Sequence, residues 1–387
     1  MPTGGGPHRA VCYDLCLRIL QTGKKIVATA KDARPDLANL DLAALEAVFL
    51  QEGLPRFRAR QVFAWIHQHG VADFSAMTNL GRELRAQLTA RFRISTPRLT
   101  HEDRSADGTR KFLFELEDGR RIEAVYIPDT PKQTFCISSQ VGCAMDCDFC
   151  LTGKMGFVRH LTPAEIAGQV RVLAEATGLA GTPFNIVLMG MGEPLHNYDS
   201  VMTTIRILCD AHGLAVAPRR ITLSTVGLVP AMEKLAQEPI MPNLAVSLHA
   251  TTDAQRDRLV PINRKYPLEA LIDACKRFPL KRRSRITFEY VLLDGVNDTP
   301  EDARRLVRLL NEVKAKVNLL PLNAAPGIPY ERPSEARVDR FARLLAEHGV
   351  TVSVRKSRGR DIRAACGQLI VEGQKKATGR RLADAMV

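Results

Sequence analysis

Three cysteines stand close together in the segment CISSQVGCAMDCDFC, which spans residues 136–150. Cys143, Cys147 and Cys150 have the spacing C-x3-C-x2-C. Thiolates at this spacing can wrap one iron-sulfur cube, and a [4Fe-4S] cluster held by three cysteines keeps one iron open for another ligand. The spacing therefore predicts a [4Fe-4S] cluster with an exchangeable position. The alternatives are a zinc site completed by His160 or a fourth cysteine, and buried thiols without a metal.

The remaining cysteines do not suggest a disulfide framework. The chain has nine cysteines, an odd number, and three of them fall within eight residues. This distribution is typical of a reducing compartment, so we expect a cytoplasmic protein. Asp14 and Arg18 interrupt the region where a secretory segment would be apolar, and no apolar run is long enough to span a bilayer. We therefore expect neither export nor membrane insertion.

The net charge of +13 is unevenly distributed. Residues 1–100 carry 14 Lys and Arg against 8 Asp and Glu, and residues 271–387 carry 24 against 14. The middle, residues 101–270, is slightly acidic with 17 against 20. Two basic flanks suit a polyanionic partner, because phosphate contacts by Lys and Arg release condensed counterions. A solubilising surface charge would give the same composition.

A chain of 387 residues, 45% of them hydrophobic, is expected to form roughly two domains. We assign no structure to residues 1–36, which form an extension. Residues 37–100 contain apolar positions at helical spacing, with Gly53 and Gly70 as stops, and predict a small helical domain. Its core is expected to contain Val62, Phe63, Trp65 and Ile66.

The rest of the chain alternates between β-rich and helical patterns. KFLFELEDGRRIEAVYIP predicts a hairpin turned at Asp118-Gly119, within a lead-in at 101–133. Six β-rich runs follow, each before a helical stretch: TFCISS, FNIVLMG, RITLSTV, NLAVSLH, ITFEYVLL and KVNLLPLN. Repeated βα units predict an α/β fold, and six units favour a partial (βα)6 barrel over 134–366. A doubly wound open sheet is the alternative. A polar, basic tail is expected at 367–387.

Polar and glycine-rich segments follow these runs, at the edge where parallel α/β domains carry their active sites. The cysteine loop follows the first run and GMGEP, at 190–194, follows the second. The combination resembles the radical SAM superfamily, whose signature is a C-x3-C-x2-C loop after the first strand of a six-fold βα barrel. The resemblance implies that S-adenosyl-L-methionine (SAM) binds the open iron and that GMGEP receives its methionyl amino group.

A narrower resemblance covers about residues 40–370. The strings that carry it are CISSQVGCAMDCDFC, MGMGEPLHNYD, RRITLSTVGLVP, AVSLHATTD, RDRLVPINRKYPLEAL, EYVLLDGVND and VRKSRGRDIRAACGQL. They are similar to the bacterial RlmN-type methyltransferases. This implies methylation of an adenine C2 in 23S rRNA, and in tRNA next to the anticodon, with two SAM molecules per turnover. We also expect an electron donor such as flavodoxin or ferredoxin, a monomer, and no membrane partner.

The same resemblance implies roles for individual residues. Cys366, in AACGQL, matches the methyl-carrying cysteine of the family. Cys136 matches the second catalytic cysteine, whose thiolate would form a disulfide with Cys366 and release the product. Glu123, in RRIEAVYIP, matches the base that removes the C2 proton. The matched SAM contacts are Gly192, Glu193, Ser224, Ser247, Leu248, His249 and Asn323.

The segment RKSRGRD places positive charge beside Cys366. Its cations are expected to contact RNA phosphates and to favour the thiolate of Cys366. They are Arg355, Lys356, Arg358 and Arg360.

Three other functions remain open from the sequence. A Cfr-like enzyme, which methylates C8 of the same rRNA adenine, shares the cysteine loop and both catalytic cysteines. A radical-generating activase of a protein partner would not need Cys366, and an iron-sulfur RNA-binding regulator would consume no SAM. Cys12, Cys16, Cys209 and Cys275 match no role, and the last two are expected to pack on amphipathic helices.

Overall fold

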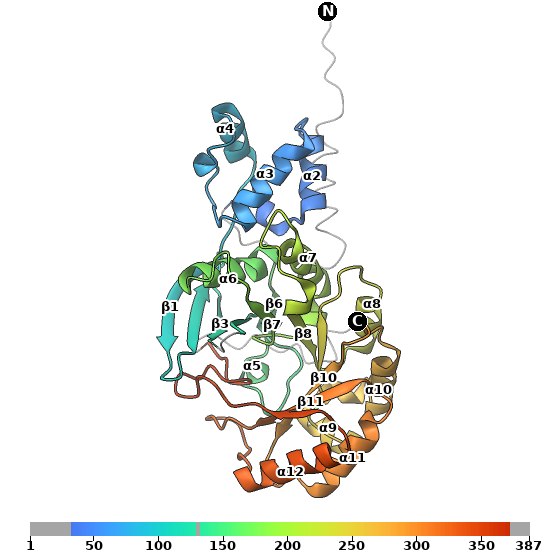
Figure 1. Cartoon of the computed structure of the whole chain (residues 1–387). Helices are drawn as coiled ribbons and strands as arrows, with labels where there is room; N and C mark the ends of the chain where they lie inside the picture. Colours follow the sequence, from blue (N-terminus) through green and yellow to red (C-terminus); the bar gives the residue numbers. More distant parts are fainter. Residues whose placement is uncertain (1–31, 129–131, 372–387) are drawn as a thin grey trace, which may run out of the picture.

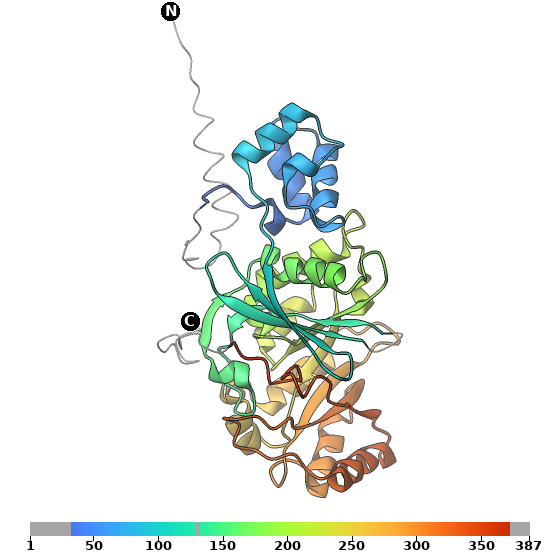
Figure 2. The ribbon, with the colours of Figure 1, turned by 90° about the vertical axis from the view of Figure 1, so that its left-hand side faces the viewer.

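The computed structural model describes residues 32–128 and 132–371 (Figure 1). The expectations for Cys12, Cys16, most of the extension and most of the tail lie outside these residues. The described chain begins with a small helical unit, continues into one large sheet, and ends in an irregular segment that returns to the first strands (Figure 2).

The predicted helical domain is present. It comprises η1 (Leu37–Asn39), α2 (Leu42–Gln51), α3 (Arg56–His67), η2 (Phe74–Ala76) and α4 (Arg82–Arg91). Gly53 and Gly70 end α2 and α3 with φ of +75° and +70°, a left-handed conformation that glycine adopts without strain. The expected core residues Val62, Phe63 and Ile66 are fully buried. Trp65 is only partly buried, and its Nε1 donates a hydrogen bond to Asn79 Oδ1.

One ten-stranded sheet forms the body of the protein. In spatial order its strands are β1 (Arg98–Arg104), β2 (Arg110–Glu115), β3 (Arg121–Ile127), β4 (Thr134–Cys136), β7 (Asn185–Leu188), β8 (Ile221–Thr225), β9 (Asn243–Ser247), β10 (Ile286–Leu292), β11 (Ala315–Pro321) and β12 (Val352–Val354). From β4 to β12 all neighbours are parallel. Their spatial order follows the chain without reversal. A doubly wound sheet reverses its order at a switch point, so that alternative is wrong and the partial barrel is confirmed.

Two strands of the large sheet, β1 and β12, were not predicted, and neither were the two strands of a small separate sheet at 140–142 and 157–160. β1 has the polar sequence RLTHEDR, which lacks a β-rich run, yet it pairs antiparallel with β2. The lead-in is therefore not a separate hairpin: β1, β2 and β3 form an antiparallel edge of the same sheet, because β3 pairs with β4. β12 adds a seventh parallel strand beyond the six expected. The helical unit ends before Arg98 rather than at residue 100.

Helices cover the outer face of the parallel strands (Figures 1 and 2). They are α6 (Pro163–Ala176), α7 (Tyr198–Cys209), α8 (Val229–Leu235), α9 (Asp253–Leu259), α10 (Leu268–Arg277), α11 (Pro300–Leu310) and α12 (Glu335–Glu347). Shorter elements are β5 (Gln140–Gly142), α5 (Leu151–Lys154), β6 (Phe157–His160), η3 (Pro194–Asn197), η4 (Pro218–Arg220) and η5 (Pro261–Arg264). Within the described ranges, none of the helices has the length and apolarity needed to span a bilayer.

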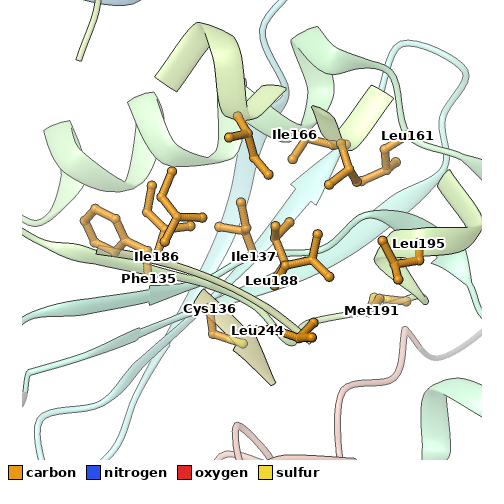
Figure 3. Close-up of a cluster of buried hydrophobic side chains, with 14 of the residues drawn as sticks. Phe135, Cys136, Ile137, Leu161, Ile166, Ile186, Leu188, Met191, Leu195 and Leu244 are labelled. Atoms are coloured by element: carbon orange, nitrogen blue, oxygen red, sulfur yellow. The ribbon is translucent and has the colours of Figure 1, made fainter. Parts of the chain in front are cut away.

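The alternation of side chains along β4 separates packing from chemistry. Figure 3 shows Phe135 and Ile137 pointing toward the layer that contains Ile166 of α6, and Cys136 pointing to the other side of the strand. Successive strand residues point to opposite faces of a sheet. The apolar neighbours of Cys136 therefore fix the strand, while its own thiol faces the inside of the barrel.

Hydrogen bonds tie the helical unit to the barrel. The Arg171 guanidinium, on α6, donates to the carbonyl oxygens of Ile66 and Ser95 at 3.2 Å each. Arg206 of α7 donates to Asp41, the residue that caps α2. The helical unit is thus held over α6 and α7.

Candidate active site

The cysteine loop is enclosed by the two-stranded sheet of β5 and β6. Its first residue is fixed by the hydrogen bond from Cys143 N to Gly156 O, 3.0 Å long. Gly142 has φ of +72°, and a Cβ on it would lie 1.8 Å from the same carbonyl oxygen. Only glycine fits there, because the two halves of the loop approach backbone to backbone.

The three predicted cluster ligands lie together in this loop. Cys143 and Cys147 are buried and Cys150 is half-buried. Burial raises the pKa of all three thiols, and the charge of Cys150 raises the pKa of Cys143 and Cys147 further. A bound metal removes the proton from a coordinating thiol and supplies the missing positive charge, so these donors fit an iron-sulfur cluster. Among the described His, Cys, Asp and Glu side chains, no three are arranged as ligands of a single metal ion.

The glycine-rich segment GMGEP is bound to the end of β4. Ser139 N and Gln140 N both donate to Met191 O, at 2.8 and 3.1 Å, and Met191 N donates to Ser138 Oγ at 2.8 Å. Gly192 has φ of +102°, and a Cβ on it would lie 2.5 Å from Gln140 Cβ. The segment is therefore fixed against the strand that leads into the cysteine loop.

The Glu193 carboxylate holds two further segments. It accepts hydrogen bonds from Leu195 N at 3.0 Å and from Val226 N, after β8, at 2.9 Å. Burial raises the pKa of Glu193 to about 7. The carboxylate therefore fixes GMGEP against the segment that follows β8.

Gln140 connects these parts and was missed by the sequence reasoning. It is fully buried, and its Oε1 accepts a hydrogen bond from Glu193 N at 2.9 Å. Its Nε2 lies 3.1 Å from His160 Nδ1 and 3.0 Å from His196 Nδ1. Burial lowers the pKa of His160 to about 4, so this ring is neutral. The available signal was the polar run SSQ directly after the first barrel strand.

Two of the expected SAM contacts lie side by side on β8 and β9. The hydroxyl groups of Ser224 and Ser247 are 3.4 Å apart. The buried guanidinium of Arg256, on α9, fixes the ends of these strands by donating to the carbonyl oxygens of Val226, Ser247 and Leu248 at 2.6–3.2 Å. Arg256 had no assigned role, although the quoted string RDRLVPINRKYPLEAL contains it.

His249 and Asn323 differ in how their polar atoms are used. His249 Nδ1 accepts a hydrogen bond from Val291 N at 3.0 Å, and burial lowers the pKa of this imidazole to about 3. Its ring lies edge-on to Phe149 of the cysteine loop, 4.7 Å away. Asn323 Oδ1 and Ser139 Oγ are instead buried without a hydrogen-bond partner among the described residues. Unpaired buried acceptors and hydroxyls fit a ligand with hydrogen-bond donors, such as SAM.

Cys136, at the end of β4, and Cys366, in the irregular segment after β12, are close enough for their charges to interact. Burial and then the charge of Cys366 raise the pKa of Cys136 to about 12, while Arg355 acts in the opposite direction. Cys366 is exposed, yet the atoms packed around its sulfur raise its pKa, and Arg355 again opposes the shift. Arg355 therefore favours the Cys366 thiolate, as expected of a basic neighbour, and burial opposes it. Every described cysteine is a free thiol, Cys209 of α7 and Cys275 of α10 included.

The segment around Cys366 is anchored on both sides (Figure 2). Upstream, Gly359 N donates to Asp107 in the turn between β1 and β2 at 3.0 Å. Downstream, Leu151 N donates to Gly367 O at 2.8 Å, and Thr152 Oγ1 donates to Leu369 O at 2.7 Å. These bonds hold Cys366 next to the cysteine loop, because Leu151 and Thr152 begin α5, directly after Cys150.

Glu123, on β3, faces a cavity of about 220 Å³. Its Oε2 accepts a hydrogen bond from Ile370 N at 2.9 Å, and its Oε1 lies 3.1 Å from Lys111 Nζ. Burial raises the pKa of Glu123 and the Lys111 charge opposes this. The carboxylate is therefore paired with Lys111. The cavity is lined by Lys111, Leu113, Arg121, Glu123, Arg363, Ile370 and Val371.

The fold and this site define a radical SAM enzyme, and comparison with known proteins agrees. Residues 137–310 match the radical SAM superfamily. A crystal structure of a radical SAM methyltransferase from Sphaerobacter thermophilus is 47% identical, with a TM-score of 0.82 over 87% of this chain and 99% of that one.

The narrower family is shown by the N-terminal unit and by whole-length relatives. Residues 35–94 match the ribosomal RNA large subunit methyltransferase N-terminal domain. Proteins named dual-specificity RNA methyltransferase RlmN are similar along most of their length. The one from Pelobacter propionicus is 52% identical over 87% of this chain and 96% of its own. The one from Anaeromyxobacter dehalogenans is 48% identical over 92% and 97%. The chain belongs to the RlmN family of radical SAM methyltransferases, which use a [4Fe-4S] cluster and SAM.

Proposed function

We propose that this chain methylates C2 of an adenine in 23S rRNA, and in tRNA next to the anticodon, through a methyl group carried on Cys366. The names of the relatives support RNA as the substrate, and RlmN membership favours C2 over C8. The observation that carries the proposal is that Cys366 is anchored next to the three-cysteine loop by the hydrogen bonds of Leu151 and Thr152, close enough to Cys136 for the charge of one to act on the other. An activase or an RNA-binding regulator would not need this pair.

The chemistry of the base explains why a sulfur carrier is needed. Adenine C2 lies between two ring nitrogens and is electron-poor, so it does not attack the methyl group of SAM directly. When bound, the cluster and SAM supply the methyl group, the electron and the hydrogen-atom acceptor. Cys366 supplies the sulfur on which the methyl group is held, after its thiol has lost a proton. Its exposed position, between two anchored segments, suits a side chain that must meet a large substrate.

The other two residues complete the transfer. As the carbon on Cys366 bonds to C2, the Glu123 carboxylate takes the C2 proton. A cluster held by Cys143, Cys147 and Cys150 would accept the one electron that this step releases. The Cys136 thiolate then attacks the Cys366 sulfur: an S–S bond forms, the S–C bond breaks, and the product carbon keeps the electron pair and takes up a proton. A thiol reductant must cleave this transient disulfide before the next turnover.

We assign the cluster to Cys143, Cys147 and Cys150, and SAM binding to Gly192, Glu193, Ser224, Ser247, Leu248, His249 and Asn323. For the last group the supporting observations are the rigid GMGEP segment, the paired serine hydroxyls and the unpaired Asn323 Oδ1. Arg355, Lys356, Arg358 and Arg360 are assigned to RNA phosphates. The helical unit and the barrel are assigned as separate domains. We further propose a cytoplasmic monomer that receives electrons from flavodoxin or ferredoxin.

The test is a Cys136→Ala variant, with Cys275→Ala as its control. Cys275 is a buried cysteine on α10. Incubated with SAM, a reductant and RNA, Cys136→Ala should accumulate a covalent protein–RNA product, visible by gel and by mass at the Cys366 peptide. The control should release 2-methyladenosine, identified by nucleoside mass spectrometry. Normal turnover by Cys136→Ala, or 8-methyladenosine as the product, would refute the proposal.

A further inference from the structure

Lys111 and Glu123 are held on one face of the antiparallel edge of the sheet. In the register of β2 and β3, Leu113 lies opposite Glu123, and Lys111 lies opposite Val125. Lys111 is therefore the diagonal neighbour of Glu123, a separation that a long side chain can bridge. It does so: Lys111 Nζ lies 3.1 Å from Glu123 Oε1, and the two side chains are only 14% and 6% exposed.

A third charge lies on the next strand. Asp103 of β1 pairs directly with Lys111, and its Oδ2 lies 3.5 Å from Lys111 Nζ. The Asp103 charge also raises the pKa of Glu123, in the opposite direction to Lys111. His101 Nε2 lies 3.0 Å from Asp103 Oδ1. The other charged groups that line the cavity in front of Glu123 are Arg121 and Arg363.

Burial favours the neutral form of a carboxyl group, and a neutral carboxyl group cannot accept the proton from C2. An ammonium group in contact with the carboxylate favours the ionised form, and the amide of Ile370 orients the second oxygen. Removing Lys111 would take away the ammonium group in contact with the buried carboxyl group, while the hydrogen bond from Ile370 N and the nearby charge of Asp103 remain.

We propose that Lys111 is a positioning residue for Glu123, which keeps the buried carboxylate ionised and directed into its cavity, and that Asp103 limits this effect. The inference rests on the proposed role of Glu123 as the base. No other described lysine forms an ion pair with Glu123. Substitutions of Lys111 and of Asp103 are therefore expected to shift the protonation of Glu123 in opposite directions, which a general loss of stability cannot produce.

The experiment measures the protonation of Glu123 directly and then the reaction. The carboxyl carbon of Glu123 is followed by ¹³C NMR as a function of pH in the intact protein, with its signal identified by its loss in Glu123→Gln. Lys111→Met should move the titration midpoint to higher pH by about one unit, as expected for the loss of an adjacent opposite charge. Asp103→Asn should move it to lower pH, and Lys111→Arg should restore the wild-type midpoint.

The rate of base methylation is then measured against pH for the same variants. Because Glu123 must be ionised, the acidic limb of each profile should move with the NMR midpoint. Arg98→Met is the control, since it removes an exposed ion pair with Glu115 on the same two strands and should move neither. An unchanged Glu123 midpoint in Lys111→Met overturns the inference. A midpoint that moves while the rate profile stays fixed supports the contact with Lys111 and refutes Glu123 as the base.

Discussion

Replacing Gln140 with leucine should weaken SAM binding without unfolding the protein. Leucine has a similar volume but no amide group, so Gly192 keeps its packing against the side chain while three hydrogen bonds are lost. Glu193 N loses its acceptor, and the two imidazole nitrogens of His160 and His196 lose their shared donor. The change therefore acts on the GMGEP segment and on the β5–β6 sheet at the same time.

The size of the effect follows from burial. Leaving a buried amide without a partner costs about 1–3 kcal/mol, and each of the other two bonds contributes about 0.5–1.5 kcal/mol. The total, about 2–6 kcal/mol, compares with about 5–15 kcal/mol of stability for a typical protein. If only about 1.4 kcal/mol of this loss is taken from the free energy of SAM binding, because GMGEP is displaced, the affinity for SAM falls about tenfold.

The assay compares Gln140→Leu with Gln169→Leu. Gln169 is also fully buried and makes three hydrogen bonds, to the main chain of Ser138 and Glu165, but none to GMGEP. Thermal unfolding of the anaerobically purified proteins should give similar losses. Equilibrium dialysis with SAM should show weakened binding for Gln140→Leu only. Wild-type affinity in Gln140→Leu, at reduced thermal stability, would refute the idea that this side chain positions the segment.

Two further predictions concern the cluster loop and the helical unit. Gly142→Ala should purify without iron, because the added Cβ would collide with Gly156 O. The control Gly178→Ala has a similar φ but open space around the added Cβ, so that variant should retain its iron. Equal iron and sulfide contents in the two variants would contradict the prediction. Burial, and then the charge of Arg171, hold the pKa of His67 well below its usual value. Below about pH 6.5 this imidazole therefore binds a proton in the unfolded chain but not in the folded protein, and the free energy of unfolding falls as the pH drops. In urea unfolding, His67→Leu should lose less stability than wild type between about pH 8 and pH 5; identical slopes would count against this cause.

The sequence alone was sufficient to predict those elements that come from a repeated pattern or from an unusual spacing of one residue type. The six barrel strands are apolar runs with turn signals after them, and all six are found where expected. The cysteine loop was predicted from spacing alone. The hairpin of β2 and β3 also follows from its turn at Asp118-Gly119, where Gly119 has φ of +77°.

The parts that could not be predicted depend on distant partners. β1 is too polar to be recognised as a strand, and it forms because β2 offers it an open edge. Gln140 and Arg256 are polar residues of a kind that is usually exposed, yet both are fully buried. Partners that are distant in the sequence satisfy them: Glu193 N and two imidazoles for Gln140, and main-chain carbonyl oxygens for Arg256. Lys111 could not be linked to Glu123 without the strand register.

The anchoring of Cys366 has a consequence for the synthesis of the protein. Ser105 Oγ donates to Asp361 Oδ1 across 256 residues, and Thr152 Oγ1 donates to Leu369 O across 217. Contacts between such remote positions form late, because the intervening chain must first be ordered. A nascent polypeptide still held at the ribosome can complete its cysteine loop long before it can place Cys366. The catalytic centre is therefore finished only after the chain has been synthesised past Leu369, and premature termination anywhere before Cys366 leaves a protein unable to hold the methyl group it would transfer.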